Sequence, residues 1–211
     1  MTKVVFIDWN KTLSYDLFWG HLQDSSHPNH THLRSIEKWL FADNREKINP
    51  WMRGEMSVND IVTQMSRDTG IDETIIIDEL RTSCENMSFS VEGIQSLLDG
   101  IQNNGIKVVI ATDNMDTFSL YTVPALHLDE MFDAILNSHN MGHLKDDEYP
   151  LDRIPFFDDY LVANGWEYSD AVLLDDSPDK DGKYARLGFE RILIDSPEAL
   201  RRSLERFARA E

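Results

Sequence analysis

Five short, unbroken apolar runs constrain the fold of this 211-residue chain more than any other feature. They are KVVFI (3–7), KVVIAT (107–112), DAILN (133–137), AVLLD (171–175) and RILID (191–195). A strand that is apolar without alternation is buried on both faces, as in a parallel sheet covered by helices on either side. The runs therefore predict the strands of an α/β fold.

Segments with helical spacing separate most of these runs. Between residues 90 and 105, apolar residues recur every three or four positions, with Ser90 as the expected N-cap and Gly105 as the stop. The segment 154–164 is helical in pattern, and so is 196–210, which Ser196 is expected to cap. This alternation predicts a Rossmann-like, doubly wound parallel sheet, with functional groups at the carboxyl ends of its strands.

The stretch from about residue 15 to 88 has no convincing strand pattern. Helical patterns dominate there, in THLRSIEKWLF (31–41), SVNDIVTQMSRDTG (57–70) and DETIIIDELRTSC (72–84). The second begins with a capping pattern from Ser57 to Asp60. We therefore predict a core made of residues 1–14 and 89–211, with residues 15–88 inserted after the first strand as an α-helical cap.

The composition narrows the classes of partner. Lysine and arginine number 20 against 38 acidic residues, which gives a net charge of −18. Such a charge repels nucleic acid and acidic membrane surfaces, so we expect neither as a partner, and an anionic substrate needs a local positive site. No apolar stretch approaches the ~20 residues of a membrane span, and the N-terminus lacks a secretory pattern. A single cysteine, Cys84, suits a reducing compartment, so we expect a cytoplasmic protein. The oligomeric state stays open.

Three polar clusters directly follow predicted strands: DWNKT (8–12), TDN (112–114) and DDSPDKD (175–181). The carboxyl ends of parallel strands lie at one edge of the sheet, so we expect the clusters to converge. Asp175 and Asp176 would repel Asp8 unless a cation such as Mg²⁺ lay between them. Thr112 and the N–H groups after it, at a helix start, suit an anion. Taken singly, each cluster also fits a turn, a helix cap or a solvated acidic loop.

With these motifs in this order, the chain resembles the haloacid dehalogenase superfamily. The family's first motif, DxDxT after an apolar strand, is matched at Asp8 and Thr12. The second motif, an apolar strand that ends in Ser or Thr, is matched at Thr112. The third is matched by Ser138, Gly142 and Lys145, and the fourth, an acidic pair that closes a strand, by Asp175 and Asp176.

The resemblance implies a Mg²⁺-dependent phosphatase that acts on a small phosphorylated metabolite. Asp8 would be the nucleophile and would form an aspartyl phosphate. Mg²⁺ would be held by Asp8, the backbone carbonyl of Asn10 and Asp176, with Asp175 close by. Thr112 and Lys145, with Asp113 and Asn114 alongside, would bind the phosphoryl group, and the cap would select the substrate.

Two departures from the family pattern lie in the first motif. Asn10 stands where the family has its general acid and base, and an amide can neither donate nor accept that proton. Three alternatives follow: a slow phosphatase, a phosphate-binding protein with little turnover, or a carbon–halogen hydrolase. The acidic pair Asp175 and Asp176 disfavours the third, because that chemistry does not require a metal site. Lys11 stands where a glycine is usual, and the role of its charge stays open.

The remaining polar residues fit no motif. Either Asp179 or Asp181 is a candidate to support the metal site. His21, His27, His30 and His32 suggest a metal site in the cap, but without cysteines or a glutamate in a known pattern their spacing favours polar loop residues, and a lining for the cap is a further alternative.

Overall fold

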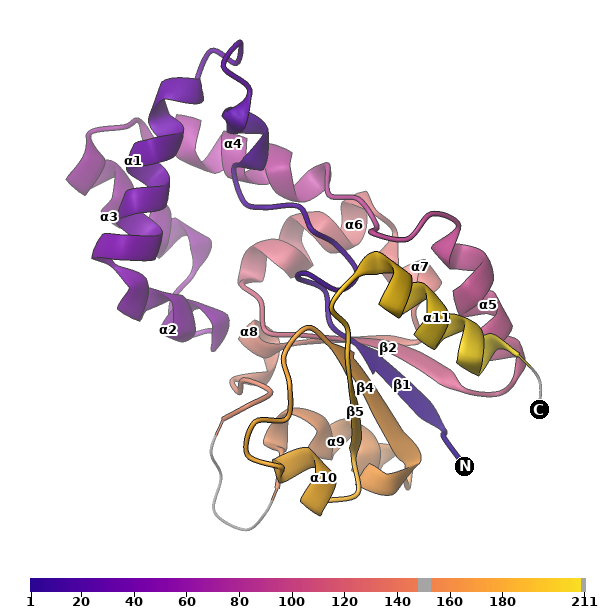
Figure 1. The fold of residues 1–211 in the computed structure, drawn as a ribbon. Coiled ribbons are helices and arrows are strands. Elements are labelled where there is room, and N and C mark those ends of the chain that lie inside the picture. Colours follow the sequence, from indigo (N-terminus) through magenta and orange to yellow (C-terminus); the bar gives the residue numbers. More distant parts are fainter. Residues whose placement is uncertain (148–152, 210–211) are drawn as a thin grey trace.

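The five predicted strands form one sheet in a computed structural model of the protein, which describes residues 1–147 and 153–209 (Figure 1). They are β1 (Val4–Ile7), β2 (Lys107–Thr112), β3 (Ala134–Asn137), β4 (Ala171–Asp175) and β5 (Glu190–Leu193). All neighbours are parallel, and the order is β3-β2-β1-β4-β5. The predicted α/β architecture is confirmed.

Helices cover both faces of the sheet. On one face, α5 (Ile94–Asn103) and α11 (Pro197–Ala208) pack against Val5 and Ile7 of β1. On the other, α9 (Pro155–Ala163) and α10 (Lys183–Arg186) pack against Val4 and Phe6. Successive side chains of a strand point to opposite faces, so the unbroken apolar run of β1 fills both layers. Three short helices complete the core: α6 (Val123–Ala125), α7 (Leu128–Met131) and α8 (Ser138–Met141).

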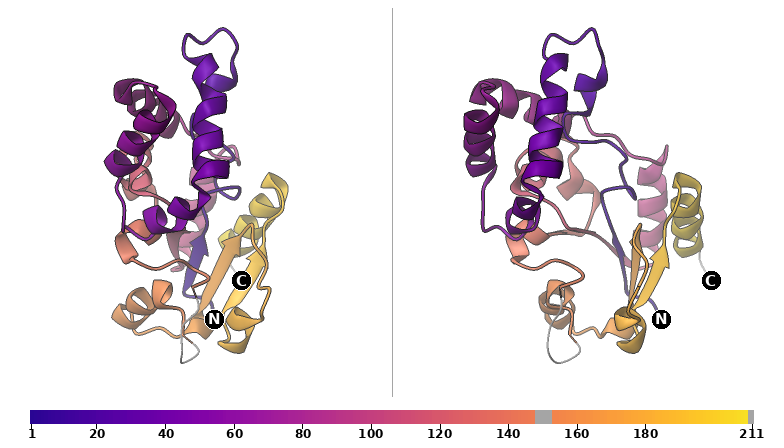
Figure 2. Two further views of the ribbon diagram at one scale, coloured as in Figure 1. Left: turned by 90° about the vertical axis from the view of Figure 1, so that its left-hand side faces the viewer. Right: turned by 60° about the vertical axis from the view of Figure 1, so that its left-hand side comes forward.

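A group of helices between β1 and β2 forms the cap. They are α1 (Leu33–Lys38), α2 (Ile48–Met52), α3 (Val58–Thr69) and α4 (Glu73–Glu85). The side chain of Ser57 accepts from the backbone N–H of Asp60 and the reciprocal bond is present, so the predicted capping box begins α3. The cap helices stand beyond the carboxyl ends of the strands (Figures 1 and 2). The cap therefore faces the edge where the sequence places the polar clusters.

The two chain segments that connect cap and core run side by side. Ser88 donates to the carboxylate of Asp16 from its backbone N–H (2.6 Å), and the N–H of Ser90 donates to the carbonyl of Leu13 (2.8 Å). The prediction of Ser90 as the N-cap of α5 is wrong. Its hydroxyl donates to the carbonyl of Thr12 (2.7 Å), and α5 begins at Ile94 after Gly93, whose φ is +71°. In the described part of the chain, no helix combines the length and apolarity needed to cross a membrane.

Candidate active site

Three strand ends bring the predicted polar residues together. Asp8 directly follows β1, Thr112 is the last residue of β2, and Asp175 is the last residue of β4. Because Ile7 pairs in register with both Ile110 and Leu174, β1 lies between the other two strands. The parallel arrangement thus places the three clusters at one edge.

Lys145 joins two of these clusters. It follows α8 and the turn at Gly142, where φ is +74°. Its ammonium nitrogen lies 2.8 Å from Oδ1 of Asp8 and 2.5 Å from Oδ2 of Asp175, and 5% of its side chain is exposed. Burial by itself would lower the pKa of Lys145, but Asp8, Asp175 and Asp113 raise it, so the group stays charged. It is a buried positive charge in an acidic protein.

Arg191 of β5 is a second buried cation at this edge. Its guanidinium donates to Oδ1 of Asp175 (2.9 Å) and to Asp146 (2.8 Å), and it lies over the ring of Tyr184. The sequence analysis did not single out this residue, because it belongs to an apolar strand pattern and not to a polar cluster. The charged residue at the start of that apolar run is the signal that could have identified it.

The two buried carboxylates, Asp8 and Asp175, have pKa values shifted in opposite directions. Burial raises the pKa of Asp8 to about 7, with Asp175 and Asp113 adding to the shift and Lys145 opposing it. Burial would also raise the pKa of Asp175, but Lys145 and Arg191 together hold it below its usual value. Asp175 is therefore a fixed anion that positions Lys145, whereas Asp8 becomes a full anion most readily when a further cation is near.

The residues at this edge fit a divalent cation. One carboxylate oxygen from each of Asp8, Asp175 and Asp176 lies within 4.8 Å of the others. Asp176 is half-buried. In the loop after β1, the N–H of Lys11 donates to the carbonyl of Ser14 (2.7 Å), and the N–H of Ser14 donates to the carbonyl of Trp9 (2.9 Å). Neither of these hydrogen bonds uses the carbonyl of Asn10. An all-oxygen set of this kind suits Mg²⁺.

Two buried hydroxyls have room for another ligand. The side-chain oxygens of Thr12 and Thr112 have no hydrogen-bond partner among the residues that the structure describes. Unsatisfied buried hydroxyls are costly. Thr112 ends β2 at this edge, and Thr12 lies in the loop that follows β1. They are suitable donors for an anion bound there.

Asp113 and Asn114 shape the loop after β2. The carboxylate of Asp113 accepts from the backbone N–H of Lys145 (3.0 Å), and the N–H of Asn114 donates to the hydroxyl of Ser138 (2.9 Å). These bonds tie the second motif to the third. Both side chains also line the cleft described below.

The first motif ends in a strained turn. Lys11 adopts a φ of +59°, in the left-handed region, which explains why a glycine would suit this position. Lys11 and Asn10 are both exposed. The carboxylates that lie within 4.8 Å of one another are those of Asp8, Asp175 and Asp176, and neither Asp179 nor Asp181 belongs to that group. Asp179 accepts from the N–H of Ala185 (3.0 Å), and the carbonyl of Asp181 accepts from Arg186 (2.5 Å). They stabilise the turn before α10.

A cleft of about 280 Å³ lies between the core and the cap. The core contributes residues of the first two motifs, and the cap contributes aromatic and aliphatic side chains. Its described lining comprises Trp9, Asn10, Asp16, Leu17, Phe18, Glu37, Phe41, Ile48, Met52, Met87, Asp113, Asn114 and Met115. No lysine, arginine or histidine belongs to this lining, so its walls are apolar with a few acidic groups.

Polar contacts hold the cap over the core. The carboxylate of Asp116 accepts from the indole of Trp51 (2.8 Å) and from the backbone N–H of Val58 (2.8 Å). Arg53 of the cap forms an ion pair with Asp147, with its Nε 3.1 Å from the carboxylate. Asp116 is buried, so its two bonds are shielded from solvent, whereas the ion pair is partly exposed. Together these contacts join the cap to the core.

The predicted histidine group divides. His21 and His27 lie near each other and near Glu79 of α4, whereas His30 contacts the carbonyl of Leu22. None of the four lines the described part of the cleft. The sequence could not identify Glu79 as their neighbour, because it is far along the chain on an ordinary helix.

Comparison with protein families and solved structures was consistent with this geometry. A family model described as haloacid dehalogenase-like hydrolase matches residues 45–185, about two-thirds of the chain, and does not reach Asp8. No curated protein matches the sequence.

Several solved structures share the fold. A predicted HAD-like family hydrolase from Porphyromonas gingivalis is 17% identical, with a TM-score of 0.68 and 100% of each chain covered. A HAD family enzyme from Bacteroides thetaiotaomicron, in complex with magnesium and inorganic phosphate, is 12% identical with a TM-score of 0.60, covering 92% of this chain and 94% of that one. The L-2-haloacid dehalogenase from Xanthobacter autotrophicus is 16% identical with a TM-score of 0.63, covering 98% and 83%. At these identities the likeness is one of fold.

Proposed function

The chain belongs to the haloacid dehalogenase-like hydrolase family, and from this premise we propose that it is a Mg²⁺-dependent phosphatase in which Asp8 accepts the phosphoryl group. The observation that carries the proposal is the buried set of Asp8, Lys145 and the acidic pair at one edge of the sheet. The complex of a structurally similar enzyme with magnesium and inorganic phosphate supports the choice of ligand.

In the proposed reaction, a carboxylate oxygen of Asp8 attacks phosphorus and the phosphorus–oxygen ester bond breaks. The leaving group departs with the bonding electrons and takes a proton from solvent. Water then cleaves the aspartyl phosphate, which releases phosphate and restores the carboxylate. Asp8, the carbonyl of Asn10 and Asp176 would hold Mg²⁺, which would supply charge neutralisation for the phosphoryl oxygens.

Positioning and charge stabilisation fall to the residues around Asp8. Lys145, fixed by Asp175, lies within hydrogen-bond reach of the attacking carboxylate and can bind a phosphoryl oxygen beside it. The unpartnered hydroxyl of Thr112 is a donor for a second oxygen. Such preorganised donors stabilise the charge that is redistributed during phosphoryl transfer.

The cleft favours a substrate whose leaving group is apolar and carries no negative charge. Its walls are mostly apolar, and Asp16, Glu37 and Asp113 supply its charged groups. A second phosphate or a carboxylate would meet like charges there and no cation. We therefore propose an aryl or otherwise apolar phosphate monoester, and expect phenyl phosphate to give a higher kcat/KM than its 4-carboxy analogue.

The proposed activity is tested by hydrolysis of an aryl phosphate in Mg²⁺ and in EDTA. Activity should require Mg²⁺ and should be lost in Asp8→Asn, because the amide is not a nucleophile. Asp129→Asn, which changes an exposed carboxylate of α7, is the matched control and should leave the rate unchanged. Full activity in EDTA, or in Asp8→Asn, would show that the mechanism is wrong.

Asn10 favours one alternative, a phosphate-binding protein with little turnover. Without a general acid, the pocket can bind a phosphate and still hydrolyse esters slowly. This alternative predicts that phosphate with Mg²⁺ raises the melting temperature while a broad panel of phosphate esters is not hydrolysed. A carbon–halogen hydrolase is less suitable, because its chemistry does not require the metal-binding acidic pair.

A further inference from the structure

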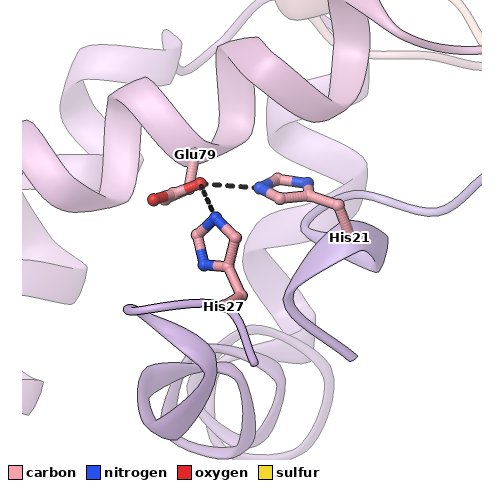
Figure 3. A group of neighbouring side chains, drawn as sticks. All are labelled: His21, His27 and Glu79. Atoms are coloured by element: carbon pink, nitrogen blue, oxygen red, sulfur yellow. Dashed lines mark hydrogen bonds and ion pairs between the residues drawn. The ribbon is translucent and has the colours of Figure 1, made fainter. Parts of the chain in front are cut away.

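A group of three side chains lies in the cap, separate from the carboxylate site of the core. His21 belongs to the short 3-10 turn Gly20–Gln23, His27 to the loop that follows, and Glu79 to α4. Figure 3 shows both imidazole rings directed at one carboxylate oxygen of Glu79. In Figure 1 the loop that carries the histidines forms the end of the cap remote from the sheet.

The three ligand atoms have the spacing of a metal site. Nε2 of His21 lies 2.6 Å from Oε2 of Glu79, and Nε2 of His27 lies 3.7 Å from the same oxygen. One ligand atom from each of the three residues lies within 4.8 Å of the other two. Ligands about 2.1 Å from a tetrahedral Zn²⁺ are about 3.4 Å apart. Side-chain shifts of about 1 Å therefore bring the three atoms to that spacing.

The surroundings orient the carboxylate and keep it ionised. The side-chain amide of Asn29 donates to the other oxygen of Glu79 (2.6 Å), which turns Oε2 toward the two rings. Burial would raise the pKa of Glu79, but hydrogen bonds from His21 and Asn29 and the nearby histidines hold it below its usual value. A deprotonated carboxylate with a second-sphere donor is the state that binds a cation.

The site is open to water on one side. The side chains of His21 and His27 are each 27% exposed, and that of Glu79 is 13% exposed. Three protein ligands with access to solvent leave a fourth position for water. The nitrogen and oxygen donors suit zinc, in contrast to the oxygen-only set at Asp8, Asp175 and Asp176.

We propose that His21, His27 and Glu79 form a zinc site, completed by water, which fastens the loop of residues 20–32 to α4. Both rings must change tautomer. Nε2 of His21 donates to Oε2 of Glu79, so its proton must move to Nδ1 before Nε2 can bind the ion. The N–H of Asn29 donates to Nδ1 of His27 at 3.2 Å, so the ring proton is on Nε2, and it must move to Nδ1 for Nε2 to bind the ion. The bond to Asn29 then opens.

The test is calorimetric titration of the full chain with Zn²⁺ after removal of metal, in saturating Mg²⁺ so that the carboxylate site of the core is filled. We expect one equivalent of Zn²⁺ to bind and to raise the melting temperature. His21→Ala and His27→Ala should each weaken binding by at least about 10-fold, and Asn29→Ala by about 10- to 100-fold. His32→Ala, in the same loop but outside the cluster, is the matched control and should bind as the wild type does.

Glu79→Gln separates metal binding from a purely hydrogen-bonded cluster. The glutamine keeps an acceptor for the histidines, so without metal it should melt close to the wild type, but its Zn²⁺ response should be lost. Bound Co²⁺ should give the intense visible absorption of four-coordinate cobalt in the wild type and not in Glu79→Gln. Absence of saturable Zn²⁺ binding, or equal binding by the wild type and Glu79→Gln, would overturn the proposal.

Discussion

Asn10 is exposed at the cleft, two residues after the proposed nucleophile, and its side chain cannot exchange protons. The proposed metal ligand is its backbone carbonyl, which any side chain leaves intact, so the substitution separates metal binding from acid–base catalysis. A general acid contributes typically ~10²–10⁴-fold to such a reaction. The residue therefore sets the expected rate of the proposed reaction and leaves the expected site intact.

Asn10→Asp should raise the rate of hydrolysis, and the gain should be larger for alkyl than for aryl phosphates. A basic alkoxide needs a proton as it leaves, whereas an aryl oxide needs it less, so we expect a gain of up to about 100-fold on alkyl esters. Steady-state kinetics over a series of leaving groups measures this. Asn10→Ala is the control and should stay near the wild type. Wild-type rates that do not fall as the leaving group becomes more basic would show that another proton donor operates.

Lys11→Gly should stabilise the fold. Lys11 has a φ of +59°, where a side chain costs about 1 kcal/mol and glycine costs little. After the added entropy of the unfolded chain, we expect a gain of about 0.5 kcal/mol, or about 1–2 °C in melting temperature. Lys11→Ala removes the charge but keeps the Cβ, so it should not gain. If alanine stabilises as much as glycine, the charge and not the backbone is responsible.

At the scale of elements, the position of the cap depends on a close contact between Gly54, after α2, and α8. A Cβ on Gly54 would lie 2.5 Å from the carbonyl oxygen of His139. The ion pair between Arg53 and Asp147 lies next to this contact in the chain. The atom that a Cβ on Gly54 would meet belongs to the backbone of His139 and not to a side chain. The contact therefore cannot adjust by a change of side-chain rotamer.

Gly54→Ala should loosen the docking of the cap on the core. Gly70 is the matched control, because its φ is also +74° but a Cβ there would meet nothing within 4 Å. Both substitutions incur backbone strain of about 1 kcal/mol, and Gly54→Ala should cost at least about 1 kcal/mol more in free energy of unfolding. Urea denaturation measures the difference. Equal losses would show that the α2–α8 contact does not hold the cap.

The sequence predicted which helices and strands exist better than it predicted the residues at which they begin and end. Apolar runs identified all five strands, because burial on both faces leaves a pattern that needs no knowledge of the partner strands. Ser90 was misassigned as a cap because its actual partners, the carbonyls of Thr12 and Leu13, are far along the chain. A local capping rule cannot register such a competing contact.

At the scale of the whole molecule, a chain with a net charge of −18 encloses two buried cations at the edge of its sheet. Parallel topology made the meeting of Asp8, Thr112 and Asp175 predictable, since each follows its own strand. Arg191 and Glu79 could not be predicted, because their partners are brought close only by the packing of β5 and α4. The residues at the strand ends could therefore be predicted from the sequence, whereas the charged residues that pack around them could not.

The central claim, that Asp8 takes the phosphoryl group beside a bound cation, is tested most directly by a crystal structure with Mg²⁺ and beryllium fluoride, which mimics a phosphoryl group on a carboxylate. We expect beryllium on an oxygen of Asp8, Mg²⁺ between Asp8 and Asp176, and contacts from Lys145 and Thr112 to the fluorides. Beryllium fluoride on another residue, or Mg²⁺ away from Asp8 and Asp176, would contradict the proposed mechanism.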